Sequence, residues 1–206
     1  MNEKEITNSF TATGYLKEEP HYSHSVYGED FYGFDFTVER LSGMCDVLPC
    51  IISSRLRECI KPGVPLEIYG QIRSYNRVVD GINRLEIRTF VREICETAEK
   101  SCVNDARLTG YICKPPVYRV TPFGREITDM LIAVNRRFSK SDYIPVIAWG
   151  RNARLCSTLN VGEKLAIAGR LQSREYEKKT EEKTEKRTAY ELSACTVRLP
   201  EEVFTI

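Results

Sequence analysis

The chain of 206 residues lacks any apolar run near the length of about 18 residues that a membrane-spanning helix needs. Its opening residues, Met1 to Ile6, also lack the apolar core of a secretion signal behind a basic end. We therefore expect a cytoplasmic protein with no membrane partner.

Histidine is scarce, with only His21 and His24, and Trp149 is the one tryptophan. Eight cysteines are present, but no two of them are spaced as Cys-x-x-Cys. A zinc centre needs clustered ligands at short spacing, so we expect no metal and no other cofactor. Most of the cysteines are expected to be reduced and to fill the core as small apolar side chains.

Catalytic motifs are also missing from the chain. It contains no nucleophile elbow, no P-loop, no His-Glu-x-x-His and no zinc-deaminase pattern. Two histidines in one short stretch leave little for acid–base catalysis. We therefore expect a binding protein and not an enzyme.

The net formal charge is only +1, but it is unevenly distributed. Residues 1–98 carry 11 Lys and Arg against 15 Asp and Glu, a net charge of −4. Residues 99–206 carry 19 against 14, a net charge of +5. This asymmetry favours the second half as the one that meets an anionic partner, while a solvated surface with a chance imbalance is the alternative.

The two halves of the sequence repeat one another at an offset that drifts from 96 through 99 to 105. The matching segments are Gly14-Tyr15-Leu16 with Gly110-Tyr111-Ile112, Asp46–Pro49 with Asp142–Pro145, and Leu66–Gly70 with Leu165–Gly169. We interpret the chain as two copies of one domain, residues 1–98 and residues 99–206.

Each copy is expected to consist mostly of strands. Phe34–Val38 and Thr128–Val134 alternate with period two, and one short helical segment follows in each copy, at Ser54–Ile60 and Arg151–Leu159. Five strands with a helix between the third and fourth is the order of the OB-fold barrel. The sequence therefore predicts an all-β protein with two tandem five-stranded OB-fold barrels.

Three local signals predict bends and turns. The glycines within Leu66–Ile72 and Leu165–Leu171 predict a bulge or sharp bend in those strands. Asp80-Gly81 predicts a hairpin turn. The charged segment Glu175–Arg187 is interpreted as a long hairpin tip, with a short charged helix as the competing interpretation.

The second copy, residues 106–198, closely resembles the bacterial single-stranded DNA-binding protein family. The residues that carry the resemblance are Gly110-Tyr111-Ile112, Pro116, Tyr118–Gly124, Leu131–Phe138, Tyr143–Gly150 and Gly169–Tyr176. The resemblance implies an OB fold, sequence-tolerant binding of single strands, and four such folds per assembly. Two chains would supply four folds, so a homodimer is expected.

The resemblance also implies the binding residues. The positions at which family members stack aromatic side chains on bases hold Phe138, Tyr143, Trp149 and Tyr176. The interleaved cations expected on phosphates are Arg136, Arg137, Arg151, Arg154, Arg170 and Arg174. Stacking contributes about 1–3 kcal/mol per base, and each neutralised phosphate adds to the salt dependence.

Taken alone, Tyr143 or Phe138 is more typical of core packing than of a stacking site. Alternation along the strand, however, separates Tyr143 and Trp149 from Ile144, Val146 and Ala148. We therefore expect Tyr143 and Trp149 to point away from the core.

The first copy lacks this aromatic set, because Val47 and Ser53 stand at the positions of Tyr143 and Trp149. We expect it to be a weak binder or an assembly scaffold. Tyr27, Phe31 and Tyr32 are candidates for a different stacking site, but packing of a β-hairpin is the favoured interpretation.

Two functions from different classes follow from these observations. The first is protection of single-stranded DNA in replication, recombination or repair, with RNA left open because stacking accepts either sugar. The alternative is a protein-interaction module, such as a primosome-type or mobile-element accessory factor. The acidic tip through which family members recruit replication and repair proteins is not evident in Leu199–Ile206.

Overall fold

The computed structural model describes residues 7–79, 81–98, 102–179 and 184–199. These residues form two compact units that interleave along the sequence. The N-terminal unit comprises Phe10–Asp105 together with Leu171–Glu191, and the C-terminal unit holds the rest. The domain boundary at residue 98 therefore stays a prediction. Among the described residues, no helix is long and apolar enough to cross a membrane.

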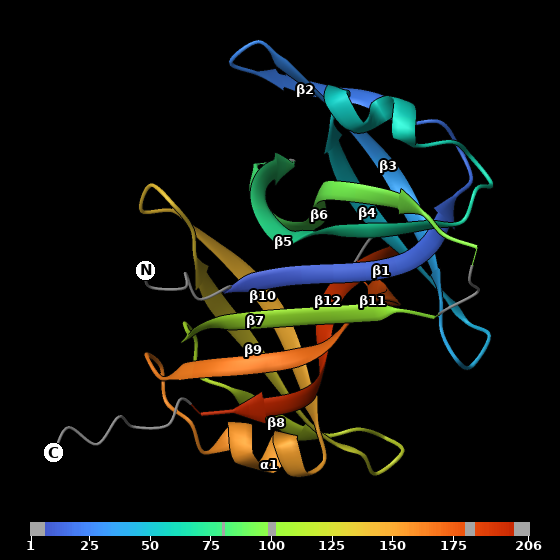
Figure 1. The fold of residues 1–206 in the computed structure, drawn as a ribbon. Coiled ribbons are helices and arrows are strands. Elements are labelled where there is room, and N and C mark those ends of the chain that lie inside the picture. Colours follow the sequence, from blue (N-terminus) through green and yellow to red (C-terminus); the bar gives the residue numbers. More distant parts are fainter. Residues whose placement is uncertain (1–6, 80, 99–101, 180–183, 200–206) are drawn as a thin grey trace, which may run out of the picture. The chain divides into compact units, whose positions relative to one another are not determined.

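The N-terminal barrel has five strands and one additional short strand. They are β1 (Asn8–Leu16), β2 (His21–Val26), β3 (Glu29–Glu39), β4 (Cys45–Ser53), β5 (Leu66–Val79) and β6 (Ile82–Glu96). Strand β1 pairs antiparallel with β3 and β5, which continue antiparallel to β4 and β6. A short parallel pairing of β4 with β6 closes the barrel. The additional strand β2 forms a hairpin with β3 (Figure 1).

The C-terminal barrel repeats this order. Its strands are β7 (Asn104–Ile112), β8 (Val117–Val120), β9 (Glu126–Asn135), β10 (Ser141–Trp149), β11 (Lys164–Lys179) and β12 (Thr184–Arg198). Parallel pairing of β10 with β12 closes this barrel, and β8 pairs with β9 as β2 does with β3. The predicted OB-fold order is confirmed, with one short strand per copy that the sequence prediction omitted.

The predicted helix between the third and fourth barrel strands is present in both copies. In the first copy it is the 3-10 helix η1 (Ser54–Cys59), which Ser53 caps by accepting a hydrogen bond from the Arg55 N–H at 3.2 Å. In the second copy it is the α-helix α1 (Arg151–Ser157; Figure 1). Ala153 and Cys156 are its buried residues. Each helix follows the third barrel strand directly.

The two copies share not only sequence but also the pattern of buried and exposed residues along matching strands. Strands β4 and β10 show the same order of buried and exposed positions after their first residue. Leu48 and Ile144, at an offset of 96, are both fully buried core residues. The largest buried side chains of the N-terminal unit include Phe10 and Phe36.

The cysteine interpretation is wrong for most of the cysteines. All eight are free, but only Cys50 and Cys156 are buried. Burial raises the pKa of the Cys156 thiol to about 11, so this side chain stays protonated in the core. Five others are exposed, and several of these lie near strand ends. Cys195 directly follows a buried position of its strand, so its side chain points to the opposite, exposed face.

The turn and bulge signals are largely confirmed. The register between β5 and β6 shifts at Tyr69/Gly70, where a Cβ on Gly70 would fall on the carbonyl oxygen of Phe90. Val79 pairs with Ile82 across the predicted hairpin turn, although Asp80 itself lies outside the described residues. The predicted helix alternative at 175–187 is wrong for the described part, which is strand up to Lys179 and again from Thr184.

A buried carboxylate ties two distant segments of the N-terminal unit together. Asp46 is fully buried and accepts hydrogen bonds from the Arg40 guanidinium at 2.7 Å and from the Ser173 backbone N–H at 2.7 Å. Arg40 also donates to the Ser173 carbonyl oxygen at 3.2 Å. Burial alone would raise the pKa of Asp46, but these hydrogen bonds outweigh it and lower the pKa below its ordinary value.

We predict that Asp46→Asn lowers the free energy of unfolding at neutral pH by about 1–3 kcal/mol, because charge-assisted hydrogen bonds are lost. The folded-state pKa is lower than the unfolded one, so the contribution is complete above about pH 4 and disappears as the pH falls further. Urea unfolding followed by circular dichroism at pH 7 and pH 3 measures the difference. An equal loss of unfolding free energy at pH 7 and at pH 3 would contradict a stabilising role of the ionised Asp46 carboxylate.

Candidate nucleic-acid interface

Trp149 lies at the end of β10, where its ring is half-buried. Its indole N–H donates to the Ser193 hydroxyl on β12 at 3.1 Å. The parallel pairing of Val146–Ala148 with Leu192–Ala194 places these two strands side by side. The hydrogen bond satisfies the one polar atom of the indole and fixes the ring, so the remaining ring surface is a preorganised apolar platform.

Tyr143 is 41% exposed near the start of the same strand. Ile144, Val146 and Ala148 are buried, as alternation predicts. Ile147 departs from the pattern, because it shares the face of Tyr143 and Trp149 but is only 4% exposed. The pairing with β12 runs over Val146–Ala148 and does not reach Tyr143. Ile147 therefore has a neighbouring strand beside it, and Tyr143 lies outside the paired stretch.

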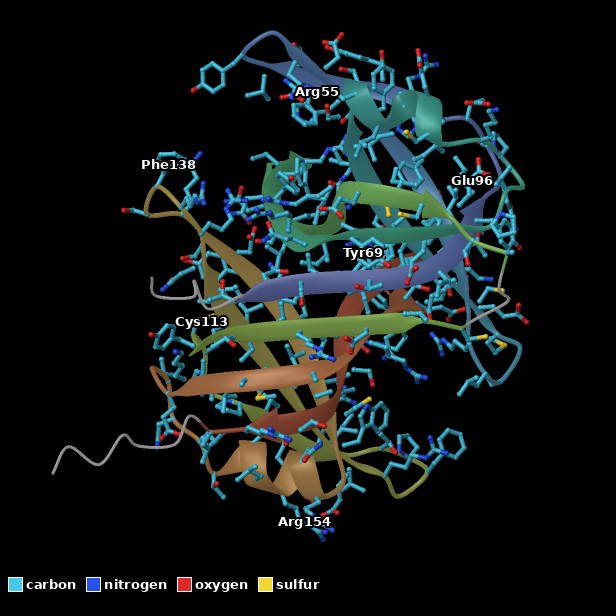
Figure 2. The ribbon with its side chains drawn as sticks, in the orientation of Figure 1. Arg55, Tyr69, Glu96, Cys113, Phe138 and Arg154 are labelled. Atoms are coloured by element: carbon cyan, nitrogen blue, oxygen red, sulfur yellow. The ribbon has the colours of Figure 1, made fainter. Side chains whose placement is uncertain are left out.

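Phe138 is 91% exposed in the β9–β10 turn, which the Arg136 N–H closes by donating to the Lys140 carbonyl oxygen (Figure 2). Its backbone has a positive φ of 62°, a conformation unfavourable for a bulky side chain. An exposed aromatic ring held in a strained turn is a feature expected of a contact residue. It does not contribute to the core.

The predicted phosphate contacts fall into two groups. Arg137, Arg151 and Arg170 are exposed on the C-terminal unit. Arg154 on α1 is also exposed, but its guanidinium lies 3.3 Å from the Glu126 carboxylate, which offsets its charge (Figure 2).

Arg136 differs from its neighbour Arg137. Its guanidinium donates to Asp142 at 3.2 Å, and the Asp142 side chain is fully buried. Arg40 and Asp46 form the same pair 96 residues earlier. The repeated pair indicates that Arg136 supports the fold, whether or not it also meets a phosphate.

Tyr176 and Arg174 belong to the N-terminal unit, on the outer part of β11. Tyr176 is 38% exposed, and the Arg174 guanidinium lies over its ring at 5.8 Å from the ring centre. Arg174 also lies 3.5 Å from the Glu191 carboxylate. A guanidinium held over an aromatic ring combines a stacking surface with a cation.

Sequence reasoning missed Ser193, which holds the Trp149 ring. Ser193 is nearly buried on β12, and nothing in its sequence context marks it. Only the parallel register of β10 and β12 identifies it as a partner of Trp149. No cluster of His, Cys, Asp and Glu able to hold a metal ion occurs within the described part of the chain.

Comparison with known proteins finds relatives of the second copy. The family described as "Single-strand binding protein family" matches residues 103–200. A single-stranded DNA-binding protein of Clostridium tetani is 38% identical over 84 residues, which are 37% of this chain and 58% of that protein. Single-stranded DNA-binding protein A of Bacillus subtilis is 34% identical over 82 residues, 36% of this chain and 48% of that protein. The chain thus spans about half the length of these curated relatives.

The fold is shared over a much longer stretch. The crystal structure of the wild-type single-stranded DNA binding protein from Thermus aquaticus matches with a TM-score of 0.75 and 20% sequence identity. The match covers 94% of this chain and 92% of that one. Because the sequence identity is low, this structural match establishes the fold alone, a tandem OB fold over the described chain.

We predict that Arg136→Ala lowers the free energy of unfolding by about 1.5–3 kcal/mol, because the buried Asp142 loses its guanidinium partner. The matched control is Arg137→Ala, which removes an exposed neighbour and should change the unfolding free energy by less than about 0.5 kcal/mol. Urea unfolding of both variants measures this. Equal stabilities would show that Arg136 has no structural role.

Proposed function

We propose that this chain binds single-stranded DNA without sequence preference, because residues 103–200 match the single-strand binding protein family. Binding would combine base stacking on aromatic rings with phosphate contacts by arginines. The proposed stacking residues are Phe138, Tyr143, Trp149 and Tyr176, and the proposed phosphate contacts are Arg136, Arg137, Arg151, Arg170 and Arg174.

The observation that carries the proposal is the Trp149 ring, fixed through its N–H by Ser193 on the neighbouring strand. A ring whose polar atom is already satisfied loses little entropy when a base stacks on it. Tyr143 is exposed on the same strand and Arg151 begins the helix that follows it. Stacking surface and positive charge therefore lie together on one strand and its continuation.

The biological role that fits this activity is protection of single strands in replication, recombination or repair in the cytoplasm. Two OB folds per chain would give four in a homodimer, the arrangement implied by the family resemblance. The mass in solution should then be twice the chain mass of 23.7 kDa, which light scattering after size exclusion measures. A monomeric mass with and without oligo-dT would contradict the homodimer.

We predict that Trp149→Ala weakens binding of oligo-dT by about 1–3 kcal/mol, because a stacking platform is lost. The matched control is Phe123→Ala, which removes a ring that is 91% exposed in the β8–β9 turn of the same unit. Fluorescence anisotropy of labelled oligo-dT gives both affinities. Unchanged binding by a folded Trp149→Ala variant would refute the proposed site.

We also predict that oligo-dT quenches the intrinsic fluorescence of Trp149, the only tryptophan of the chain. The affinity should fall steeply with salt, because each neutralised phosphate releases counterions. A parallel titration with oligo-U separates DNA from RNA preference. A folded chain whose tryptophan emission responds to neither oligonucleotide would favour the protein-interaction function instead.

A further inference from the structure

The first copy carries two aromatic rings beside the position at which the second copy carries Trp149. Ser53 ends β4 where Trp149 ends β10, at the offset of 96. In the first copy Ile51 pairs with Phe90 on β6, and in the second copy Ile147 pairs with Ser193 on β12. Phe90 therefore occupies the place of Ser193.

The other neighbouring strand shows a related exchange. Phe31 on β3 pairs with Ser53, whereas the buried Ile127 on β9 pairs with Trp149. In the second copy one large ring lies against two smaller side chains. In the first copy the central side chain is small and both its neighbours are rings.

The two rings contact one another and a third ring extends the group. The centres of Phe31 and Phe90 lie 6.0 Å apart, and His24 on β2 stacks on Phe31 at 5.1 Å with an angle of 15° between the ring planes. Phe31 and Phe90 are half-buried and His24 is exposed. We call Phe31, Phe90 and His24 the N-terminal ring cluster.

Arginines flank this cluster on the outward face of the β5–β6 hairpin. Arg77 and Arg88 share the single carboxylate of Glu86, at 3.3 and 3.2 Å, so one positive charge of this trio is not offset within it. Arg92, two residues beyond Phe90, is exposed and donates to the neutral amide oxygen of Gln71 at 3.0 Å. Arg77, Arg88 and Arg92 with Glu86 thus carry a net formal charge of +2, although residues 1–98 carry a net charge of −4.

One acid of the β2–β3 hairpin, Glu29, is already engaged. The Glu29 carboxylate accepts from the Ser53 hydroxyl at 2.6 Å and lies 3.5 Å from the Arg55 guanidinium. Arg55 stands on η1, beside the β2–β3 hairpin that supplies His24 and Phe31 (Figure 2). Two further acids lie near Phe31 on β3, Asp30 directly before it and Asp35 four residues after it.

We propose that the N-terminal ring cluster is a second stacking site for single-stranded nucleic acid, with Arg92 and the Arg77–Arg88 pair contacting its phosphates. This extends the proposed function of the second copy to the first and rests on it for the class of ligand. It replaces the expectation that the first copy is a weak binder or a scaffold. Rings beside arginines whose charge is not fully offset are what a single strand needs.

The test measures anisotropy of labelled oligo-dT with the full chain carrying Trp149→Ala, which weakens the second copy. Adding Phe90→Leu or Phe31→Leu removes a ring but keeps apolar volume, and should weaken the remaining binding about 5- to 150-fold. The matched control is Tyr69→Leu, because Tyr69 is a 36% exposed ring on the same hairpin beside Glu67 and Glu93. Tyr69→Leu should leave the affinity unchanged.

The same substitutions in the otherwise unchanged chain separate this proposal from the proposed function. If Trp149→Ala weakens binding and the two Phe variants, shown to be folded by circular dichroism, do not, the second site is overturned and the first stands. If the Phe variants weaken binding and Trp149→Ala does not, the second site is supported and the Trp149 site fails.

A second measurement applies if the leucine variants do not fold. Phe90→Trp in a Trp149→Phe chain places the only tryptophan in the N-terminal ring cluster. Quenching of its emission by oligo-dT, weakened by salt, supports the site. Absence of quenching at oligo-dT concentrations that saturate the anisotropy signal overturns it.

Discussion

The parallel pairing that closes each barrel is the constraint on which both candidate sites depend. It involves only a few residues, Val146–Ala148 with Leu192–Ala194 and Cys50–Ile51 with Thr89–Phe90. Strands paired in this way are joined by long connections, so the residues that meet across them are far apart in the sequence. Trp149 meets Ser193 and Phe31 meets Phe90 only because each barrel closes at this seam.

Closure also sets which side chains can serve as a platform. A side chain in the middle of β10 is covered by neighbours on both sides, which is why Ile147 is buried on an outward face. Tyr143 lies beyond the paired stretch and Trp149 lies at its far end. On this face Ile147 is buried, Pro145 and Trp149 are half-buried and Tyr143 is exposed, so the two aromatic rings lie outside the stretch paired with β12.

Much of this architecture could be predicted from the sequence, because its signals are local or repeated. Alternation in β10, the glycine at the β5 bulge and the helix after the third strand follow from residue-level rules. The offset of 96 matched β4 with β10 residue by residue. The ring pair of the first copy could be predicted only in part. The sequence marks Phe31 as a candidate stacking residue, but comparison along the repeat finds Ser53 at the position of Trp149 and gives no sign of Phe90. The register between the two strands that close a barrel produces no periodic pattern in the sequence of either strand. The position of Phe90 beside Ile51 is therefore seen only in the structure.

The two copies satisfy one spatial requirement with different sequences. At the seam, a small side chain must lie beside a large ring, because two large rings on adjacent outward positions would compete for the same space. The second copy meets this with Trp149 and Ser193, and the first with Ser53 and Phe90. The second arrangement gives the ring a hydrogen bond, and the first gives its ring a partner in Phe31. Ser53 in place of an aromatic residue therefore shows only that β4 lacks a ring. Whether the site is lost depends also on the residue that lies beside it on the adjacent strand, here Phe90.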